Sequence, residues 1–298
     1  MFDFRYHVAS LAAVFLALII GILVGVGISG TGFVKESERD RLNRVIDDLR
    51  ADRDAARGER DQLRADSGGM QTFVEESYPL VMDERLRGKR IAVVSIGAMP
   101  AEVEHAIGES LTDADATLVR TVVLTMPGDM SRITAALRRR PALEGAAGRW
   151  STIGSRLGKE VVRGESDFLT ALEPIVVEER SGSGAEDVDG VVVVGQPPVQ
   201  NDTPRAELMR ALYRGLAGSS PSAAVEARGQ RPGTVADLAQ YGFATIDDVD
   251  TRLGRVALAG VLAGDQGATK GKRYGTKSTA EDGALPPLAP VQPAETGG

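Results

Sequence analysis

The sequence predicts an α/β protein with three parts: an N-terminal transmembrane helix, a coiled-coil spacer, and a mostly parallel sheet with helices on both faces. Three observations support this fold class. Residues 8–28 are apolar and uncharged, leucines then recur every seven positions among charged residues, and short apolar runs alternate with helical patterns over residues 89–265. Such alternation is typical of parallel sheets covered by helices.

The apolar run of residues 8–28 predicts a membrane-spanning helix. As a helix it would be about 31 Å long, which matches the hydrocarbon thickness of a bilayer. The alternative is a cleaved signal peptide, but signal cores are shorter, at about 7–15 apolar residues, and no A-x-A site follows this run. Gly21 and Gly25 lie one turn apart, a spacing that lets two membrane helices approach closely. Glycine is also simply common in membrane helices.

The short N-terminal stub, residues 1–7, predicts the orientation of the chain. A stub of this size normally stays in the cytoplasm, so the bulk of the chain is expected outside the cell membrane. Its aromatic residues Phe2, Phe4 and Tyr6 suit the membrane interface. The alternative for this stub is a docking segment for a cytoplasmic partner.

Residues 33–67 predict a parallel coiled coil. Leu42, Leu49 and Leu63 recur in one heptad position, Ile46 fills the other core position once, and arginines fill the rest of that position. We therefore expect a homodimer formed through this spacer and the membrane helix. The alternative is a single solvated helix supported by ion pairs between neighbouring turns. Gly68 and Gly69 are expected to end the helix.

The domain over residues 89–265 is predicted from runs that alternate in type. Expected strands cover 90–97, 117–125, 188–195 and 223–227, with a weak one at 175–178. Expected helices cover 101–111, 130–139, 149–172, 204–216 and 251–263, with Thr203 and Asp250 as N-caps. Residues 266–298 lack periodicity and are rich in Gly, Lys, Ala and Pro, which predicts a disordered tail.

The composition excludes several functions. A formal charge of -7 argues against nucleic-acid binding, which normally needs a basic face. The chain has no cysteine and two histidines, so thiolate sites, cysteine nucleophiles and most histidine triads are excluded. No phosphate-binding motif with an apt Lys and Ser/Thr pair is present, and no cofactor is expected.

Few residues at the strand ends carry chemistry. Met99, Met126 and Met130 sit at neighbouring strand ends, where thioethers could together hold copper(I), although core packing is the simpler interpretation. Asp129 and Gln196 are the polar residues that an enzyme would use there. Asp247 and Asp248 are expected to be solvated. The protein is therefore predicted to be no enzyme.

Three stretches resemble the MctB copper-transport family of actinobacteria: FRYHVASLAAVFLALIIGILVG, TIDDVDTRLGRVALAGVLAG and Lys272-Arg273-Tyr274-Gly275. The last stretch departs from the family pattern, because Arg273 stands where the family often has histidine. The resemblance implies a role in copper homeostasis or efflux at the cell envelope, with copper itself as a family-implied ligand. The family also includes SteB-type proteins, which pair with the cytoplasmic protein SteA and act in cell separation and in control of wall hydrolases.

Taken together, the sequence favours a non-enzymatic dimeric scaffold in the cell membrane that takes part in copper homeostasis. An envelope protein is expected as partner of the outer domain, and a SteA-like protein as partner of the stub. The alternatives are a SteB-like regulator of cell separation, direct copper handling by the domain, and a small-molecule enzyme.

Overall fold

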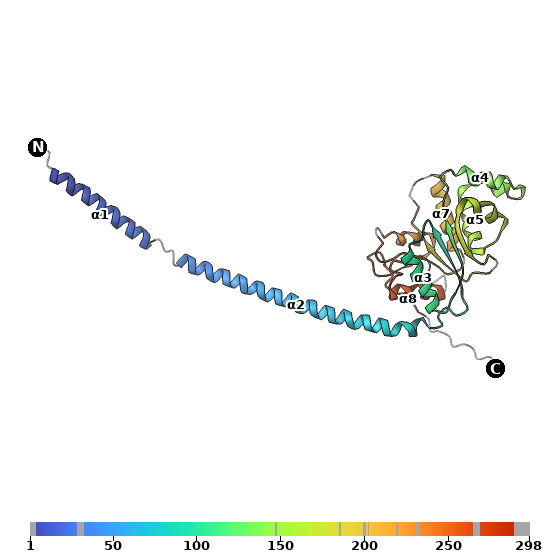
Figure 1. The fold of residues 1–298 in the computed structure, drawn as a ribbon, viewed down its shortest axis with the longest axis horizontal. Coiled ribbons are helices and arrows are strands. Elements are labelled where there is room, and N and C mark those ends of the chain that lie inside the picture. Colours follow the sequence, from blue (N-terminus) through green and yellow to red (C-terminus); the bar gives the residue numbers. More distant parts are fainter. Residues whose placement is uncertain are drawn as a thin grey trace. The chain divides into compact units, whose positions relative to one another are not determined.

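The computed structural model describes residues 4–28, 33–146, 148–184, 186–198, 201, 203–218, 220–230, 233–264 and 269–288 (Figure 1). The chain divides into two compact units, residues 1–70 and 71–298, which are described separately. The first contains the apolar helix and most of the spacer, and the second contains the sheet and its covering helices.

Helix α1 (Phe4–Ile28) is the candidate membrane span. Its segment Tyr6–Gly27 is long and apolar enough to cross a bilayer, and none of it is buried inside the structure. At 1.5 Å per residue these 22 residues extend about 33 Å, close to the hydrocarbon thickness. An apolar surface of this size needs a partner other than water, so the expected transmembrane helix has the length and exposure that a bilayer requires.

Helix α2 (Phe33–Met82) is longer than the sequence predicts. The expected break at Gly68 and Gly69 is wrong: the helix continues through both glycines and through Pro79. Glycine costs only about 1 kcal/mol per position relative to alanine, which the helical segments on either side can offset. Pro79 lies in the last turn, where its carbonyl still accepts from Asp83 N at 2.9 Å. The length and exposure of α2 fit a spacer, and its pairing as a coiled coil stays a prediction.

The second unit holds one seven-stranded sheet in the order β3-β2-β1-β4-β5-β6-β7. Its strands are β1 (Arg90–Ile96), β2 (Thr117–Leu124), β3 (Val177–Gly182), β4 (Gly190–Val194), β5 (Ser222–Val225), β6 (Ala244–Ile246) and β7 (Arg273–Tyr274). All pairings are parallel except that of β2 with β3. The predicted mostly parallel sheet is therefore confirmed. The strand at β6 and the one at β7 were not predicted, because both are too short to show a pattern.

Helices cover both faces of the sheet, as predicted. The first core cluster lies under α4 (Ser131–Arg138), α5 (Trp150–Arg163), α6 (Asp167–Val176) and α7 (Pro204–Ala217), with the short helices η1 (Pro141–Ala146) and η2 (Val235–Tyr241). The second cluster lies under α3 (Ala101–Asp113), α8 (Arg252–Ala263) and the end of α2. Figure 1 shows α3 and α8 together on one side of the strands and α4, α5 and α7 on the other.

The helix starts agree partly with the predicted caps. Thr203 caps α7 as predicted, since its hydroxyl accepts from Ala206 N at 3.3 Å. For α8 the prediction of Asp250 is wrong, because Thr251 is the N-cap and accepts from Gly254 N at 3.0 Å. Asp250 instead accepts from Arg228 N at 2.6 Å, and this bond ties the loop after β5 to the start of α8.

The predicted disordered tail over residues 266–298 is wrong for residues 269–288. Strand β7 pairs with β6, so it satisfies the backbone groups of an otherwise open sheet edge. Tyr274 is buried in the second cluster, and Leu285 and Leu288 pack against it. The composition misleads here because a few apolar residues are enough to dock a segment when the rest of the domain already supplies the surface that they pack against.

Arg120 is a fully buried cation in the middle of β2, with 1% of its surface exposed. Its guanidinium donates to five backbone carbonyls: those of Val161, Val162, Ser183, Gly184 and Glu186. Burial is the main cause that lowers the pKa of this guanidinium. The arginine joins the sheet, the last turn of α5 and the loop after β3, so one side chain fixes three segments.

Candidate functional site

The carboxyl ends of β2, β1 and β4 form the edge where ligands bind in open α/β sheets. Asp129 lies in the loop after β2 and accepts from Ser131 N at 2.9 Å, which starts helix α4. Hydrogen bonds from Ser131 hold the pKa of Asp129 below its ordinary value. Gln196, after β4, accepts at its backbone carbonyl from the Tyr213 hydroxyl at 2.6 Å. The Asp129 side chain thus takes part in ordinary turn structure, and Gln196 contributes its backbone carbonyl to the packing of α7.

The strand order also places β1 beside β4, which is where a dinucleotide would bind in a Rossmann-type sheet. The turn after β1 leads into α3, whose first turn carries Glu102 and Glu104. Two carboxylates at a helix N-terminus occupy the position in which a pyrophosphate would be stabilised. This chemistry disfavours a phosphate ligand at that turn.

The three candidate copper ligands are divided between the two core clusters. Met126 is buried in the first cluster and Met130 packs against it, whereas Met99 packs against the second cluster on the other face of the sheet. Flexible thioethers commonly fill gaps in cores. Among the described residues, no group of three or more His, Cys, Asp or Glu side chains could hold a metal ion.

A buried acidic corner lies where β5, β6 and β7 end. We use this name for Glu226, Asp247, Asp248, Thr276 and Lys277. The three carboxylate residues are at most 3% exposed, so the expected solvation of Asp247 and Asp248 is wrong. Asp247 accepts from the backbone N–H groups of Thr276, at 2.9 Å, and Lys277, at 3.3 Å.

The acidic corner brings together two of the stretches that resemble the family. Asp247 and Asp248 belong to the segment around α8, and the groups that bind Asp247 follow Gly275 directly. Gly275 has a φ of +135° and lies against the Asp247 carboxylate, where a side chain would have no room. The signal that could have predicted this corner is an acidic run directly after an apolar strand, because carboxylates there lie at the sheet edge.

Lys277 is the counter-charge of the acidic corner. Its Nζ lies 2.7 Å from Glu226 Oε1, while Glu226 Oε2 accepts from Thr234 N at 3.0 Å and Val235 N at 3.2 Å. Asp248 differs, because its Oδ1 atom is buried without a hydrogen-bond partner among the described residues. Burial is the main cause that raises its pKa, which favours a protonated carboxyl. The corner therefore stabilises the docked tail through hydrogen bonds to Asp247 and the Lys277–Glu226 ion pair.

We expect Lys277→Met to loosen the docked tail. The change leaves Glu226 buried without its cation, and removing one partner of a buried pair costs about 3 kcal/mol. Amide hydrogen exchange of β7 in the full-length protein should speed up. The matched control is Lys272→Met, whose pair with Asp282 is about half exposed and should matter little. Equal exchange in the two variants would contradict the role given to Lys277.

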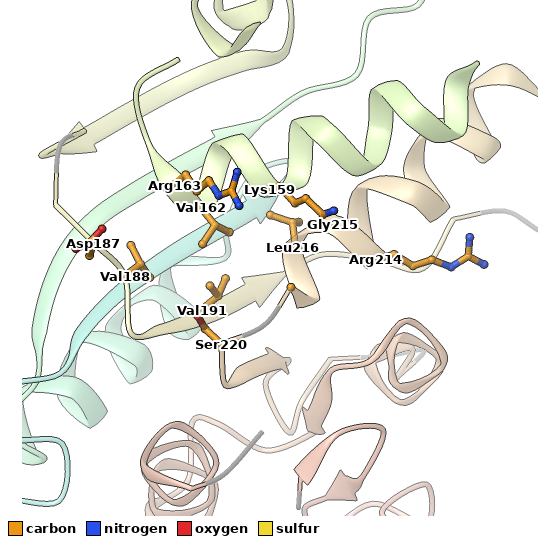
Figure 2. A pocket seen from close by; sticks show the side chains of 11 residues that line it. Lys159, Val162, Arg163, Asp187, Val188, Val191, Arg214, Gly215, Leu216 and Ser220 are labelled. Atoms are coloured by element: carbon orange, nitrogen blue, oxygen red, sulfur yellow. The ribbon is translucent and has the colours of Figure 1, made fainter. Parts of the chain in front are cut away.

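A separate hollow of about 870 Å³ lies between the last turns of α5 and α7 (Figure 2). Figure 2 shows Val162, Val188 and Val191 gathered inside it, with Arg214 extending away. Lys159, Arg163 and Arg214 are its cations and Asp187 its acid. Arg163 and Arg214 occupy last turns, where positive charge offsets the carbonyl end of a helix. Their charge thus has a structural role already.

The fold defines a class: an α/β protein with an N-terminal candidate membrane helix. The family described as "Copper transport outer membrane protein, MctB" matches residues 1–285, so the chain belongs to that family. The resemblance seen in the three sequence stretches is thereby confirmed, and the protein is related to copper transport at the envelope. No curated protein matches the chain.

Proposed function

We propose that this protein is a non-enzymatic, single-pass scaffold of the cell membrane that supports copper homeostasis as a homodimer. Its N-terminus lies in the cytoplasm, and its α/β domain binds an envelope partner outside. Gly21 and Gly25 contribute to the dimer in the membrane, and the spacer contributes Leu42, Ile46, Leu49 and Leu63. Copper efflux then depends on the partner proteins that the scaffold assembles.

The exposed seam of α2 is the observation that carries this proposal. Leu42, Leu49 and Leu63 are 59%, 62% and 69% exposed within the single chain. Apolar side chains spaced by seven residues on one helix are normally covered by another helix. A second copy supplies that helix without any further protein. The strand-end chemistry, in which Asp129 and Gln196 serve turns, supports a role without catalysis.

The orientation can be tested with single cysteines, because the natural chain has none. Asp3→Cys marks the stub and Ser278→Cys marks an exposed position in the second unit. In intact cells, a membrane-impermeant maleimide should label only Ser278→Cys, and lysis should expose both. Labelling of Asp3→Cys alone in intact cells would overturn the proposed orientation.

For a scaffold, we expect no tight copper(I) site in the full-length protein in detergent micelles. A competition titration should show only the weak affinity of scattered thioethers. The triple variant Met99→Leu, Met126→Leu and Met130→Leu keeps similar side-chain volumes and should titrate like the natural chain. Tight stoichiometric binding that this variant loses would instead establish direct copper handling at the methionines.

The family offers a second role, control of cell separation through a SteA-like cytoplasmic partner of the stub. Deleting the gene separates the two roles. Copper sensitivity with normal division supports the scaffold in copper homeostasis. Chained cells with normal copper tolerance would replace that proposal by the regulatory one.

A further inference from the structure

The spacer has a seven-residue charge pattern that the apolar seam alone does not explain. With Leu42 at heptad position d, the a positions are Arg39, Ile46, Arg53 and Arg60, and the residues just before them, at g, are Glu38, Val45, Asp52 and Glu59. All of them lie on α2, and all are exposed. Arginines fill the e positions 50, 57 and 64.

The chemical character of each a residue matches that of the g residue before it. The three arginines at a follow Glu38, Asp52 and Glu59, whereas the aliphatic Ile46 follows Val45. In a parallel coiled coil, each a side chain inserts into a hole that the partner's preceding g residue helps to form. Each buried arginine would therefore meet an acid of the other chain, and Ile46 would meet a valine.

Antiparallel pairing would reverse these contacts. The g residues would then lie beside g residues and the e residues beside e residues. That arrangement places Asp52 and Glu59 among the partner's acids and gathers arginines 50, 57 and 64 together. Like charges held side by side destabilise a pair by amounts similar to those that opposite charges contribute. The same sequence therefore favours one orientation and disfavours the other.

The arginines at a already have one acidic neighbour within the helix. Arg53 lies 2.8 Å from Asp54, and Arg60 lies 2.7 Å from Asp61. These pairs leave further N–H donors on each arginine, because a guanidinium carries five of them. One edge can bind the acid of its own chain while another edge meets the partner's g acid. Polar residues at a positions commonly fix register at a cost in stability.

From this pattern we infer that two copies of α2 pair in parallel and in register, with Arg53 held by Asp52 of the second copy and Arg60 by Glu59. The inference rests on the proposed dimer and adds a charge argument for its parallel orientation, its register and its ionic layers. A slide by one heptad would set Ile46 against Arg53 and is thereby disfavoured. Parallel pairing also places both α1 helices on one side, so the two copies share a single membrane.

The absence of natural cysteines allows a direct test in the full-length protein reconstituted in liposomes. Ala56→Cys, at position d, should form disulfide-linked dimers under mild oxidation. Ala65→Cys, at the outward position f, is the matched control and should remain largely without a disulfide cross-link. Leu42→Cys and Leu63→Cys should each cross-link to their own kind. Leu42→Cys and Leu63→Cys chains that carry different tags should, when mixed, give no disulfide-linked dimer that contains both tags.

Charge reversal tests the ionic layers in the Ala56→Cys background. Asp52→Arg with Glu59→Arg should lower the cross-linked fraction about tenfold at limiting protein concentration, a ratio that corresponds to about 1.4 kcal/mol. The control is Asp47→Arg with Asp61→Arg, at the outward b position. It also reverses two charges, but it should lower the cross-linked fraction far less.

The outcomes separate the two proposals. Mixed Leu42→Cys and Leu63→Cys dimers, or an unchanged fraction after reversal at g, would overturn the parallel register while leaving a dimer. Absence of cross-linking at every d position would overturn the dimer itself.

Discussion

Replacing Arg120 with methionine is expected to destabilise the second unit by about 4 kcal/mol. Methionine keeps the aliphatic bulk but removes every donor, so the carbonyls of Val161, Val162, Ser183 and Glu186 lose the partner that Arg120 provides. Each of these hydrogen bonds has a charged donor, and losing one costs about 1 kcal/mol or more. Gly184 is less affected, since its carbonyl also accepts from Glu165 N at 3.2 Å.

Part of that cost is offset, because the variant no longer buries a cation. This relief does not decide the outcome, since Arg120 also acts as the cap of α5. The carbonyls of Val161 and Val162 belong to the last turn, where the helix itself supplies no donor. We therefore expect two effects: α5 frays at its C-terminal end, and the free energy of unfolding falls.

The measurement is urea unfolding of the full-length protein in detergent, followed by the fluorescence of Trp150, the single tryptophan, which begins α5. Arg180→Met is the matched control. Arg180 pairs at 3.3 Å with Glu173, whose side chain is 38% exposed, so the loss of this pair should cost less than about 1 kcal/mol. Equal losses in the two variants would refute the special role of Arg120.

The second large effect is expected for Gly158→Ala, which should cost about 2–3 kcal/mol. Helices α5 and α7 approach so closely that a Cβ on Gly158 would lie 2.7 Å from Leu216 N and 2.8 Å from the carbonyl carbon of Gly215. These are backbone atoms, which cannot rotate away. The two helices would have to separate and expose part of the first core cluster.

For the control variant, Gly108→Ala, we expect a change in stability of the opposite sign. Gly108 lies inside α3, and a Cβ there would meet nothing within 4 Å. Gly108→Ala should therefore stabilise the protein by up to about 1 kcal/mol, the ordinary gain in helix propensity. Thermal melting should move down for Gly158→Ala and up for Gly108→Ala. A rise for both would show that the α5–α7 contact adapts easily.

Features that depend on neighbouring residues can be predicted from the sequence alone. The apolar run of α1, the valine run of β4 and the cap at Thr203 are local patterns, and each lies where it was predicted. The family could also be predicted from short stretches, because those stretches are contiguous in the chain. Parallel sheet with helices on both faces follows from alternation alone.

Features that depend on residues far apart in the chain become visible only in the folded protein. The docking of residues 269–288, the burial of Asp247 and the five carbonyls around Arg120 each need distant partners, 29 residues away for Asp247 and Thr276 and 41 or more for Arg120. The structure also separated Met99 from Met126 and Met130, because neighbouring strand ends send their loops to opposite faces of the sheet. Local patterns report which face of an element is apolar, whereas burial of a charge depends on the surface that folding brings against it.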